Sequence, residues 1–353
     1  MRTNNLGGAT KAELESIFYN KKFDFSYSSM NKLIGAPTVF YKEYVLKQKE
    51  DVYAKHLRKG KIIHYLLLDN GLFSQQYVLA PEGIPGDTTK SIVDEVFQQY
   101  KELQAQSENP IPNQLKDYEG NILEILARLP LHQKLVDDKK SPFLTGDEKR
   151  INKIITTQTE EYFTFLMNLG DREIMDPKEL EECTVAVEAL RANKTIRELL
   201  GLDVEFADEN FGVYNELYHR VDTKYAWGLK GFIDNVVVDV KNKTVRINDL
   251  KTTSKSLTLF KESVEFWNYW LQAGVYLILV MDYLKEVIDS SWTIEFRFVV
   301  VDKYNHVYPF KVSEETLTTW VNNANEQFEK SDYHYVNRNY TLPYEFIAGE
   351  VVL

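Results

Sequence analysis

The chain has 353 residues, 44% of them hydrophobic and 13% aromatic, which fits a soluble globular protein of roughly two domains. No apolar run reaches the roughly 18 residues of a membrane span, and the N-terminus lacks the apolar core of a secretory signal, so we expect a cytoplasmic protein with no membrane contact. The single cysteine, Cys183, excludes an internal disulfide, a cysteine zinc site and a cysteine-ligated iron–sulfur cluster. The net charge of −11 argues against a protein that coats DNA through charge alone.

The first part of the chain, residues 1–85, predicts helices. One of them is strongly apolar and carries a histidine, His64, before Gly71 supplies a C-terminal stop. Ser26 is a predicted helix cap. We expect helices at Lys11 to Asn20, Thr38 to Lys49 and Tyr53 to Leu68, and a short strand at Phe73 to Leu79.

Residues 86–202 have mostly helical periodicity and predict a helical insertion. Prolines break the pattern between its segments, and no repeat or low-complexity run occurs. The expected helices are Ile92 to Gln106, Asn121 to Leu129, Asp147 to Asn168 and Pro177 to Leu200.

Residues 203–330 change to the alternation of strands and predict a β-sheet with accompanying helices. Three strands form an expected antiparallel meander, followed by a long apolar helix with Trp267 on its buried side. Residues 331–353 read as an irregular tail after a final helix capped at Ser313. The expected strands are Phe211 to Val221, Ala226 to Val240, Thr244 to Leu250, Ser291 to Asp302 and Val307 to Val312, and the long helix is Lys261 to Tyr283.

Two aspartates and a lysine stand on neighbouring strands of this meander. Asp234 ends an apolar segment, and Asp249 and Lys251 alternate along the next strand, so they share one face. If the strands pair as a hairpin through Lys241 to Lys243, the two aspartates come close together. Carboxylate oxygens suit Mg²⁺ or Mn²⁺, which activate water and shield charge on a phosphate ester. Lys251 can hold or deprotonate that water, so the pattern indicates metal-dependent phosphodiester cleavage.

An aspartate two residues before a lysine is common by chance, and a solvated pair at a strand end explains a lone match. Here other elements accompany it in a fixed order. His64 lies on an apolar helix far upstream, and Gly231 to Asp234 place a glycine and two apolar residues before the first aspartate. Gln272 and Tyr276 are four residues apart on one face of the following helix.

With these residues the sequence resembles the PD-(D/E)xK nuclease superfamily, in its RecB-like branch, and more narrowly the RecE-type exonucleases of phages and prophages. The resemblance implies an α/β fold with a restriction-endonuclease-like core, in which helices flank a mixed central sheet, and a helical insertion. A site that concentrates carboxylates around metals also weakens the objection from the acidic charge. The matching residues are Gly60 to Leu68, Glu216, Gly231 to Asp234, Asp249 to Thr253, and Gln272 with Tyr276.

The resemblance also implies roles for the matched positions. Lys251 would orient or activate the water, and Glu216, Gln272 and Tyr276 would complete the catalytic set. The alternatives are that His64 and Tyr276 are packed core residues and that Glu216 is a surface glutamate. The implied ligands of one or two Mg²⁺ or Mn²⁺ ions are His64, Asp234, Asp249 and Leu250, and the implied DNA contacts are Gln272, Tyr276, Thr252 and Lys61.

The expected activity is Mg²⁺-dependent exonuclease cleavage at linear duplex DNA ends, 5′ to 3′, in phage recombination or replication. The resemblance further implies a ring-like homo-oligomer that works with a single-strand annealing protein, in the host cytoplasm if the chain is phage-encoded. The absence of cysteine clusters and of a P-loop sequence favours a stand-alone nuclease without an iron–sulfur cluster. Two alternatives stay open: a structure-specific or single-strand endonuclease, and a DNA-end-binding module whose site has decayed.

Overall fold

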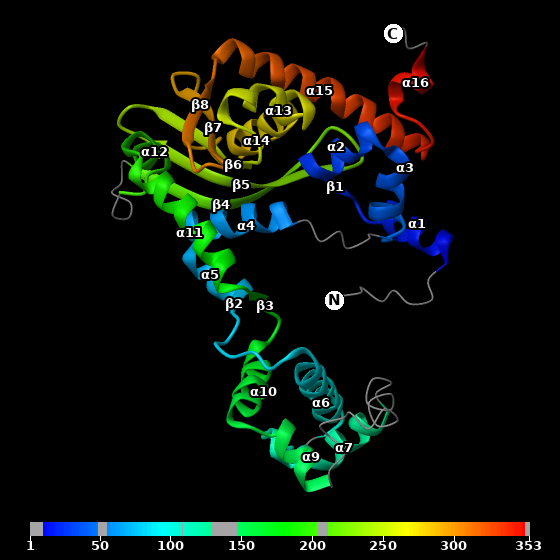
Figure 1. Ribbon diagram of the computed structural model, residues 1–353. Helices are drawn as coiled ribbons and strands as arrows, with labels where there is room; N and C mark the ends of the chain where they lie inside the picture. Colours follow the sequence, from blue (N-terminus) through cyan, green and yellow to red (C-terminus); the bar gives the residue numbers. More distant parts are fainter. Residues whose placement is uncertain (1–9, 49–54, 108, 129–146, 204–210, 350–353) are drawn as a thin grey trace. The chain divides into compact units, whose positions relative to one another are not determined.

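The computed structural model describes residues 10–48, 55–107, 109–128, 147–203 and 211–349. The chain divides into two compact units, residues 1–70 with 182–353 and residues 71–181 (Figure 1). The insertion therefore begins at residue 71 and ends at 181, where the sequence pattern predicts 86 and 202. Pairing of the short strands β2 (Tyr77–Leu79) and β3 (Glu173–Met175) explains the shift, because it ties both segments to the smaller unit.

The larger unit is built on a six-stranded mixed sheet. Its strands run in the order β1-β5-β6-β7-β8, and β4 also pairs with β5. β4, β5 and β6 form the expected antiparallel meander, whereas β6 pairs with β7, and β1 with β5, in parallel. The strands are β1 (Asp24–Phe25), β4 (Phe211–Asp222), β5 (Gly228–Asp239), β6 (Thr244–Thr253), β7 (Thr293–Asp302) and β8 (Val307–Val312).

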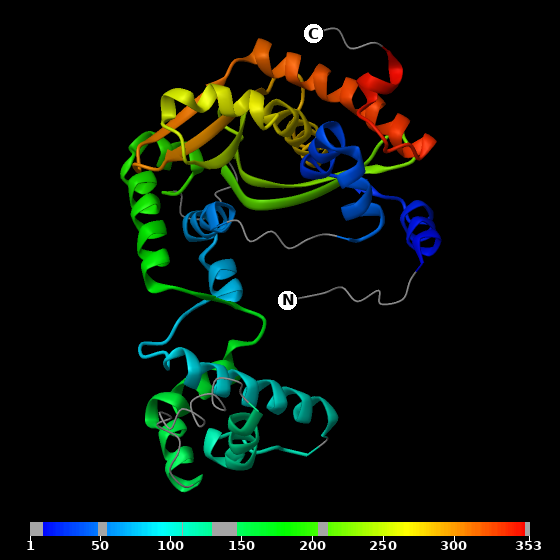
Figure 2. The same ribbon diagram turned by 45° about the vertical axis from the view of Figure 1, so that its right-hand side comes forward.

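Helices flank this sheet on both sides, so the predicted fold class is confirmed. The apolar helix α14 (Tyr269–Tyr283) and the amphipathic α15 (Glu314–Asn337) lie on one side, and α4 (Lys55–Leu68) lies on the other (Figures 1 and 2). No described helix is long and apolar enough to cross a membrane. The other helical segments of this unit are α1 (Lys11–Asn20), α2 (Tyr27–Gly35), α3 (Pro37–Phe40), a π-helical turn (Tyr41–Val45), α12 (Lys194–Leu200), a 3₁₀ turn (Leu257–Leu259), α13 (Phe260–Phe266) and α16 (Tyr344–Ala348).

The smaller unit is mainly helical and has its own core, which includes the fully buried Ile92, Ile122 and Phe163. Thr156 caps a helix within it by accepting a hydrogen bond from the Thr159 N–H. The unit contains α5 (Asn70–Gln76), α6 (Asp87–Gln106), a 3₁₀ turn (Leu115–Tyr118), α7 (Glu119–Arg128), α9 (Asp147–Ile154) and α10 (Thr157–Leu169), and α11 (Pro177–Ala192) contains its boundary at residue 181.

Three long helices expected from periodicity are each two helices. A polar residue that favours a cap or a turn stands at every break. Thr156 caps α10, Asn193 caps α12, and Asn268 adopts the left-handed region with φ 54° between α13 and α14. Because the apolar stripe continues across each break, periodicity alone does not reveal it. The break at Asn268 also leaves Trp267, expected to be buried, 50% exposed.

Other local expectations are also corrected. The segment 73–79 is a strand only at Tyr77–Leu79, because helix α5 occupies Asn70–Gln76. Helix α4 ends at Leu68 as expected, but Gly71 lies inside α5 and is not the residue that stops α4. Thr38 to Lys49 is α3 followed by a π-helical turn. The tail is not irregular, since α15 continues to Asn337 and α16 follows. Three expected helix boundaries, at Lys49, Tyr53 and Leu129, lie outside the described residues.

Helices α14 and α15 approach closely at Gly274. A Cβ atom there would lie 2.8 Å from Ala324 Cβ and 3.0 Å from the Trp320 carbonyl oxygen. Neither neighbour is a flexible side-chain end that can move aside. The absence of a side chain at Gly274 therefore sets the spacing of these helices.

We expect Gly274→Ala to destabilise the fold by about 1–3 kcal/mol, because the added methyl group overpacks the helix contact. Thermal unfolding followed by circular dichroism measures this. Gly35→Ala is the matched control, since a Cβ at Gly35 meets nothing within 4 Å. Equal unfolding midpoints for the two variants would contradict the close-packing argument.

Candidate active site

The acids of the sequence motif lie where strand pairing is interrupted. β4 and β5 are paired through Asn215 with Asn235, and again from Leu217 with Ile233, but not at Glu216 and Asp234 between them. Pairing of β5 with β6 likewise stops at Asn235 with Asn248. Asp234 and Asp249 are therefore the first residues beyond the point at which β5 and β6 separate, and Glu216 faces the same point from β4.

Glu216 has an unusual backbone conformation for its residue type. Its φ is 49°, inside the left-handed region that costs a non-glycine residue about 1 kcal/mol or more. The strand continues on both sides of it, so the distortion is local. Such strain in the middle of a strand is typical of a functional site, and here it falls on the residue opposite Asp234.

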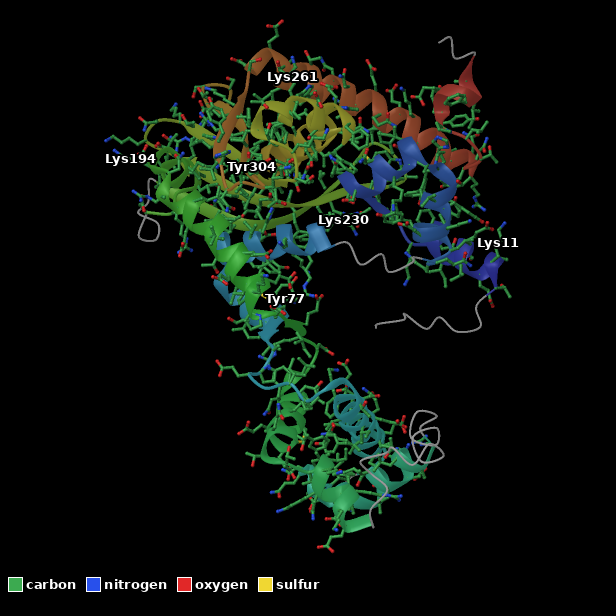
Figure 3. The ribbon with its side chains drawn as sticks, viewed as in Figure 1. Lys11, Tyr77, Lys194, Lys230, Lys261 and Tyr304 are labelled. Atoms are coloured by element: carbon green, nitrogen blue, oxygen red, sulfur yellow. The ribbon has the colours of Figure 1, made fainter. Side chains whose placement is uncertain are left out.

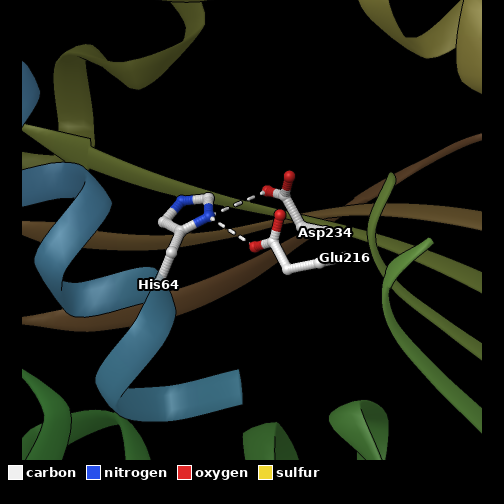
Figure 4. A group of neighbouring side chains, drawn as sticks. All are labelled: His64, Glu216 and Asp234. Carbon is white, nitrogen blue, oxygen red and sulfur yellow. Dashed lines mark ion pairs between the residues drawn. The ribbon is translucent and has the colours of Figure 1, made fainter. Parts of the chain in front are cut away.

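His64 reaches the acids from α4, on the other side of the sheet from α14. Its Nδ1 lies 3.7 Å from Glu216 Oε1 and 3.7 Å from Asp234 Oδ2 (Figure 4). Its Nε2 lies 2.8 Å from the Leu250 carbonyl oxygen. Because a carbonyl only accepts, Nε2 carries the proton of this bond, which leaves Nδ1 directed at the two carboxylates.

A glycine on α4 allows this approach. A Cβ at Gly60 would lie 3.0 Å from Thr252 Oγ1, so a larger residue would push α4 away from β6. Thr252, expected to contact DNA, thus lies beside the histidine helix. Lys61, the other expected DNA contact, is exposed on α4, with its ammonium group 5.5 Å from the centroid of the Tyr65 ring. Among the described residues, no ion pair or hydrogen bond joins Lys61 to the acids.

Lys251 links the acids to helix α14. Its Nζ lies 2.6 Å from Asp249 Oδ2 and donates to Gln272 Oε1 at 2.9 Å. The Gln272 amide in turn donates to the Tyr276 hydroxyl at 2.9 Å. The lysine ammonium also lies 4.7 Å from the centre of the Tyr269 ring. The structure therefore brings Gln272 and Tyr276 to the site through Lys251, and both are buried.

Burial and mutual repulsion perturb the ionisation of the site. Burial raises the pKa of Asp249 to about 6 and also raises the pKa of Asp234. Burial opposes the charge of Lys251, but the two aspartates outweigh it and raise the lysine pKa. For His64, burial is likewise outweighed by Asp234 and Glu216, and the pKa rises to about 9. Without a bound cation, the site holds a lysine and an imidazolium against its carboxylates.

The residues present fit a divalent cation. Ligand atoms of His64, Glu216 and Asp234 all lie within 4.8 Å of one another. The buried oxygens Glu216 Oε1 and Asp249 Oδ1 have no hydrogen-bond partner among the described residues. Buried carboxylate oxygens seldom lack a partner, and a carboxylate-rich set with one imidazole suits Mg²⁺ or Mn²⁺. Glu216 thus joins the expected ligands.

Leu250 contributes through its main chain in two directions. Its N–H donates to Asp234 Oδ2 at 2.8 Å, which replaces the missing strand-to-strand hydrogen bond where β5 and β6 separate. Its carbonyl oxygen accepts from His64. In this arrangement Leu250 orients two of the implied ligands, and its carbonyl oxygen is already hydrogen-bonded.

A row of three asparagines, which sequence reasoning missed, borders the acids. Asn235 donates to Asn215 Oδ1 at 2.7 Å, and Asn248 donates to Asn235 Oδ1 at 2.7 Å, so the row crosses β4, β5 and β6. The side-chain amides also bind the last carbonyl groups of two helices: Asn248 binds Leu199 (2.9 Å) and Asn235 binds Leu200 (3.1 Å) on α12, and Asn215 binds Leu68 (3.0 Å) on α4.

The sequence does contain a signal for this row. Each asparagine is the immediate neighbour of a site acid, in the pairs Asn215-Glu216, Asp234-Asn235 and Asn248-Asp249. Because the strands pair in register at the asparagines, the acids form the adjacent row. The asparagine row, through Asn215, also fixes the C-terminal end of the helix that carries His64.

Comparisons with known proteins show the family of this chain. A crystal structure from Eubacterium rectale, described as a "putative exonuclease", is similar with 11% identity and a TM-score of 0.44, over 94% of this chain and 87% of that one. No curated protein matches significantly. A sequence model of the PD-(D/E)XK nuclease superfamily matches residues 24–333. The chain therefore belongs to the PD-(D/E)XK nuclease superfamily.

We expect Asn215→Leu to weaken Mg²⁺ binding about 10-fold or more, because the variant leaves the Leu68 carbonyl without its donor and loosens the His64 helix. Isothermal titration calorimetry with MgCl₂ measures the affinity. Asn242→Ala is the matched control, since the Asn242 side chain bonds Asp239 in the β5–β6 turn. Unchanged affinity in Asn215→Leu, with the control also unchanged, would show that the row does not position the ligand.

We also expect Mg²⁺ binding at pH 7.5 to release about one proton. The pKa of His64 is about 9 in the metal-free site, so the imidazole is protonated at this pH and must become neutral to act as a ligand. Calorimetry in buffers of different ionisation enthalpy counts the protons. His64→Gln should release none from this position. Equal proton release by both proteins would remove His64 from the ligand set.

Proposed function

We propose that this nuclease is a Mg²⁺-dependent DNA exonuclease that acts at the ends of linear duplexes. The observation that carries the proposal is the convergence of three carboxylates, Glu216, Asp234 and Asp249, with His64, and with Lys251 beside them. Two of the buried carboxylate oxygens have no hydrogen-bond partner among the described residues. These residues come from three strands and a helix on the opposite side of the sheet from α14. Together they supply a cation site and a fixed positive charge, which hydrolysis of a phosphodiester requires.

A cation held there would supply Lewis-acid chemistry, because it would neutralise charge on the phosphate and lower the pKa of water. The chain supplies the positioning. Asp234 is held by the Leu250 N–H, and His64 by the Leu250 carbonyl oxygen, so one peptide segment sets the direction of two ligands. Unaided phosphodiester hydrolysis is very slow, so such preorganisation has to act together with the cation.

Lys251 acts in this proposal as a cation rather than as a base. Asp249 and Asp234 raise its pKa, so the ammonium form persists at neutral pH. Asp249 and Gln272 accept two of its three N–H groups, and Tyr276 holds Gln272 in turn. The third N–H group is free to orient the attacking water or to contact a phosphate oxygen.

The preference for ends rests on the resemblance of the motif set to RecE-type exonucleases. In the same proposal the protein forms a ring-like homo-oligomer, cleaves 5′ to 3′ and works with a single-strand annealing protein in the cytoplasm during phage recombination. Analytical ultracentrifugation tests the oligomer. A structure-specific endonuclease is the alternative, and covalently closed circles distinguish the two, since an exonuclease leaves them intact.

We expect Lys251→Ala to lower Mg²⁺-dependent release of nucleotides from linear duplex DNA at least 100-fold, because the fixed positive charge is lost. A time course with label at either the 5′ or the 3′ end measures the rate and the polarity. Lys255→Ala is the matched control, because Lys255 lies four residues further on and forms a solvent-exposed pair with Glu262.

Two results would contradict the proposal. Wild-type protein that is inert on every linear DNA with both Mg²⁺ and Mn²⁺ would remove nuclease activity and favour a DNA-end-binding module. Equal loss of activity in Lys251→Ala and Lys255→Ala would show that Lys251 has no special role.

A further inference from the structure

The α4 side of the sheet carries an ordered series of side chains that continues away from the metal site. Gly231 faces α14, because a Cβ there would lie 2.8 Å from Leu279 Cδ1. Side chains alternate along a strand, so Lys230, Phe232 and Asp234 point to the other side, where α4 lies. Along β5 this side therefore presents a basic, an aromatic and an acidic side chain in turn.

The paired strand β4 also carries an aromatic side chain at this level. Tyr218 is the register partner of Phe232, just as Glu216 faces Asp234. The two rings lie 5.0 Å apart between centroids with planes tilted by 47°. Tyr218 is 50% exposed and Phe232 58%, so the pair is open to solvent although it lies in the middle of long strands. Two residues along a strand span about 7 Å, which sets the distance between the aromatic pair and the acids.

Beyond the aromatic pair, the next residue on this side of β5 is Lys230 (labelled in Figure 3), which has no carboxylate partner among the described residues. Its register partner Arg220 differs, because Asp24 and Asp222 bind it. A lysine without an acid suits an anion such as a phosphate group.

We propose that Tyr218 and Phe232 form a base-stacking subsite that holds an unpaired nucleobase of the substrate strand beside the scissile phosphate, with Lys230 contacting the next phosphate. The proposal rests on the proposed function, since it takes the acids as the place where a DNA strand is cut. The subsite continues the acid row at about the length of one nucleotide, and Lys230 follows it along β5 in the direction away from the metal site.

A subsite of this kind selects for frayed or single-stranded ends. Aromatic rings stack on the faces of bases, and those faces are accessible only when the base has left the duplex. The rings do not read sequence, because every base has such a face. An exposed cross-strand aromatic pair can also simply stabilise the sheet. The experiment therefore has to distinguish base stacking from this structural role.

The experiment compares DNA ends that differ only in their bases. Duplexes carry a short unpaired stretch on either strand, made of normal nucleotides or of abasic sugar-phosphates, and fluorescence anisotropy measures their Kd. All proteins carry Lys251→Ala, so the DNA stays intact in Mg²⁺. The test variant adds Tyr218→Leu with Phe232→Leu. The matched control adds Tyr304→Leu with Phe346→Leu, the same residue types at 60% and 58% exposure.

We expect the test variant to raise Kd about 10-fold on normal ends and to match the control on abasic ends. Tyr218→Phe with Phe232→Trp should restore binding to normal ends. Equal weakening on normal and abasic ends would overturn the subsite, because the pair would then act through the fold or the DNA backbone. A failure of the Lys251→Ala protein to bind DNA, or an equal affinity of that protein for both ends, would overturn it as well.

The cleavage assay keeps this proposal separate from the proposed function. A wild-type protein that binds ends in a base-dependent manner but never cuts them would refute the nuclease activity and leave the subsite standing. A wild-type protein that cuts normal and abasic ends alike, with unchanged cleavage in Tyr218→Leu with Phe232→Leu, would refute the subsite and leave the nuclease standing.

Discussion

The constraint on which this structure depends is the burial of several carboxylates at one point of the sheet. Asp234 and Asp249 are almost inaccessible to solvent, and Glu216 faces them. Removing each charge from water costs several kcal/mol, and their mutual repulsion adds to that cost. Lys251 and His64 offset part of it, and burial still raises the pKa values of both aspartates. A bound cation would offset the remaining repulsion between the carboxylates. The affinity for a metal and the unfavourable energy of the empty site therefore have the same origin.

The surrounding fold holds these groups in place against that repulsion. The separation of β5 from β6 leaves main-chain groups unpaired, and Asp234 uses one of them, the Leu250 N–H. The asparagine row joins three strands to the ends of α4 and α12, and Gly60 lets α4 approach β6. The acids lie inside the strands, at the level where pairing of β4 with β5 and of β5 with β6 is interrupted. The unpaired backbone there and the strained conformation of Glu216 leave side chains free to converge.

The sequence predicted the parts of this arrangement that depend on short-range pattern. Alternation located all the strands of the meander, and the order of Asp234, Asp249 and Lys251 placed them on neighbouring strands. All three lie inside β5 and β6 rather than at the strand ends. The sequence pattern did not reveal the features that depend on contacts between distant segments. A helix break at Asn268 looks like any polar residue in an apolar stripe, and the left-handed φ of Glu216 has no local sequence cause. The asparagines were visible beside the acids, but their partners are carbonyl groups at helix ends, which no residue type reveals.

The acidic charge of the chain, −11, is compatible with a nucleic-acid substrate once charge is considered locally. Acids that hold cations present positive charge to a phosphate when loaded, so they do not repel it as free carboxylates would. Lys251 lies directly against Asp249 in the site, so it supplies positive charge locally. Non-specific attraction to DNA grows with the number of phosphates neutralised, and a few local cations keep it low. Such a protein relies on the geometry of its site, rather than on overall charge, to select a strand that reaches the acids.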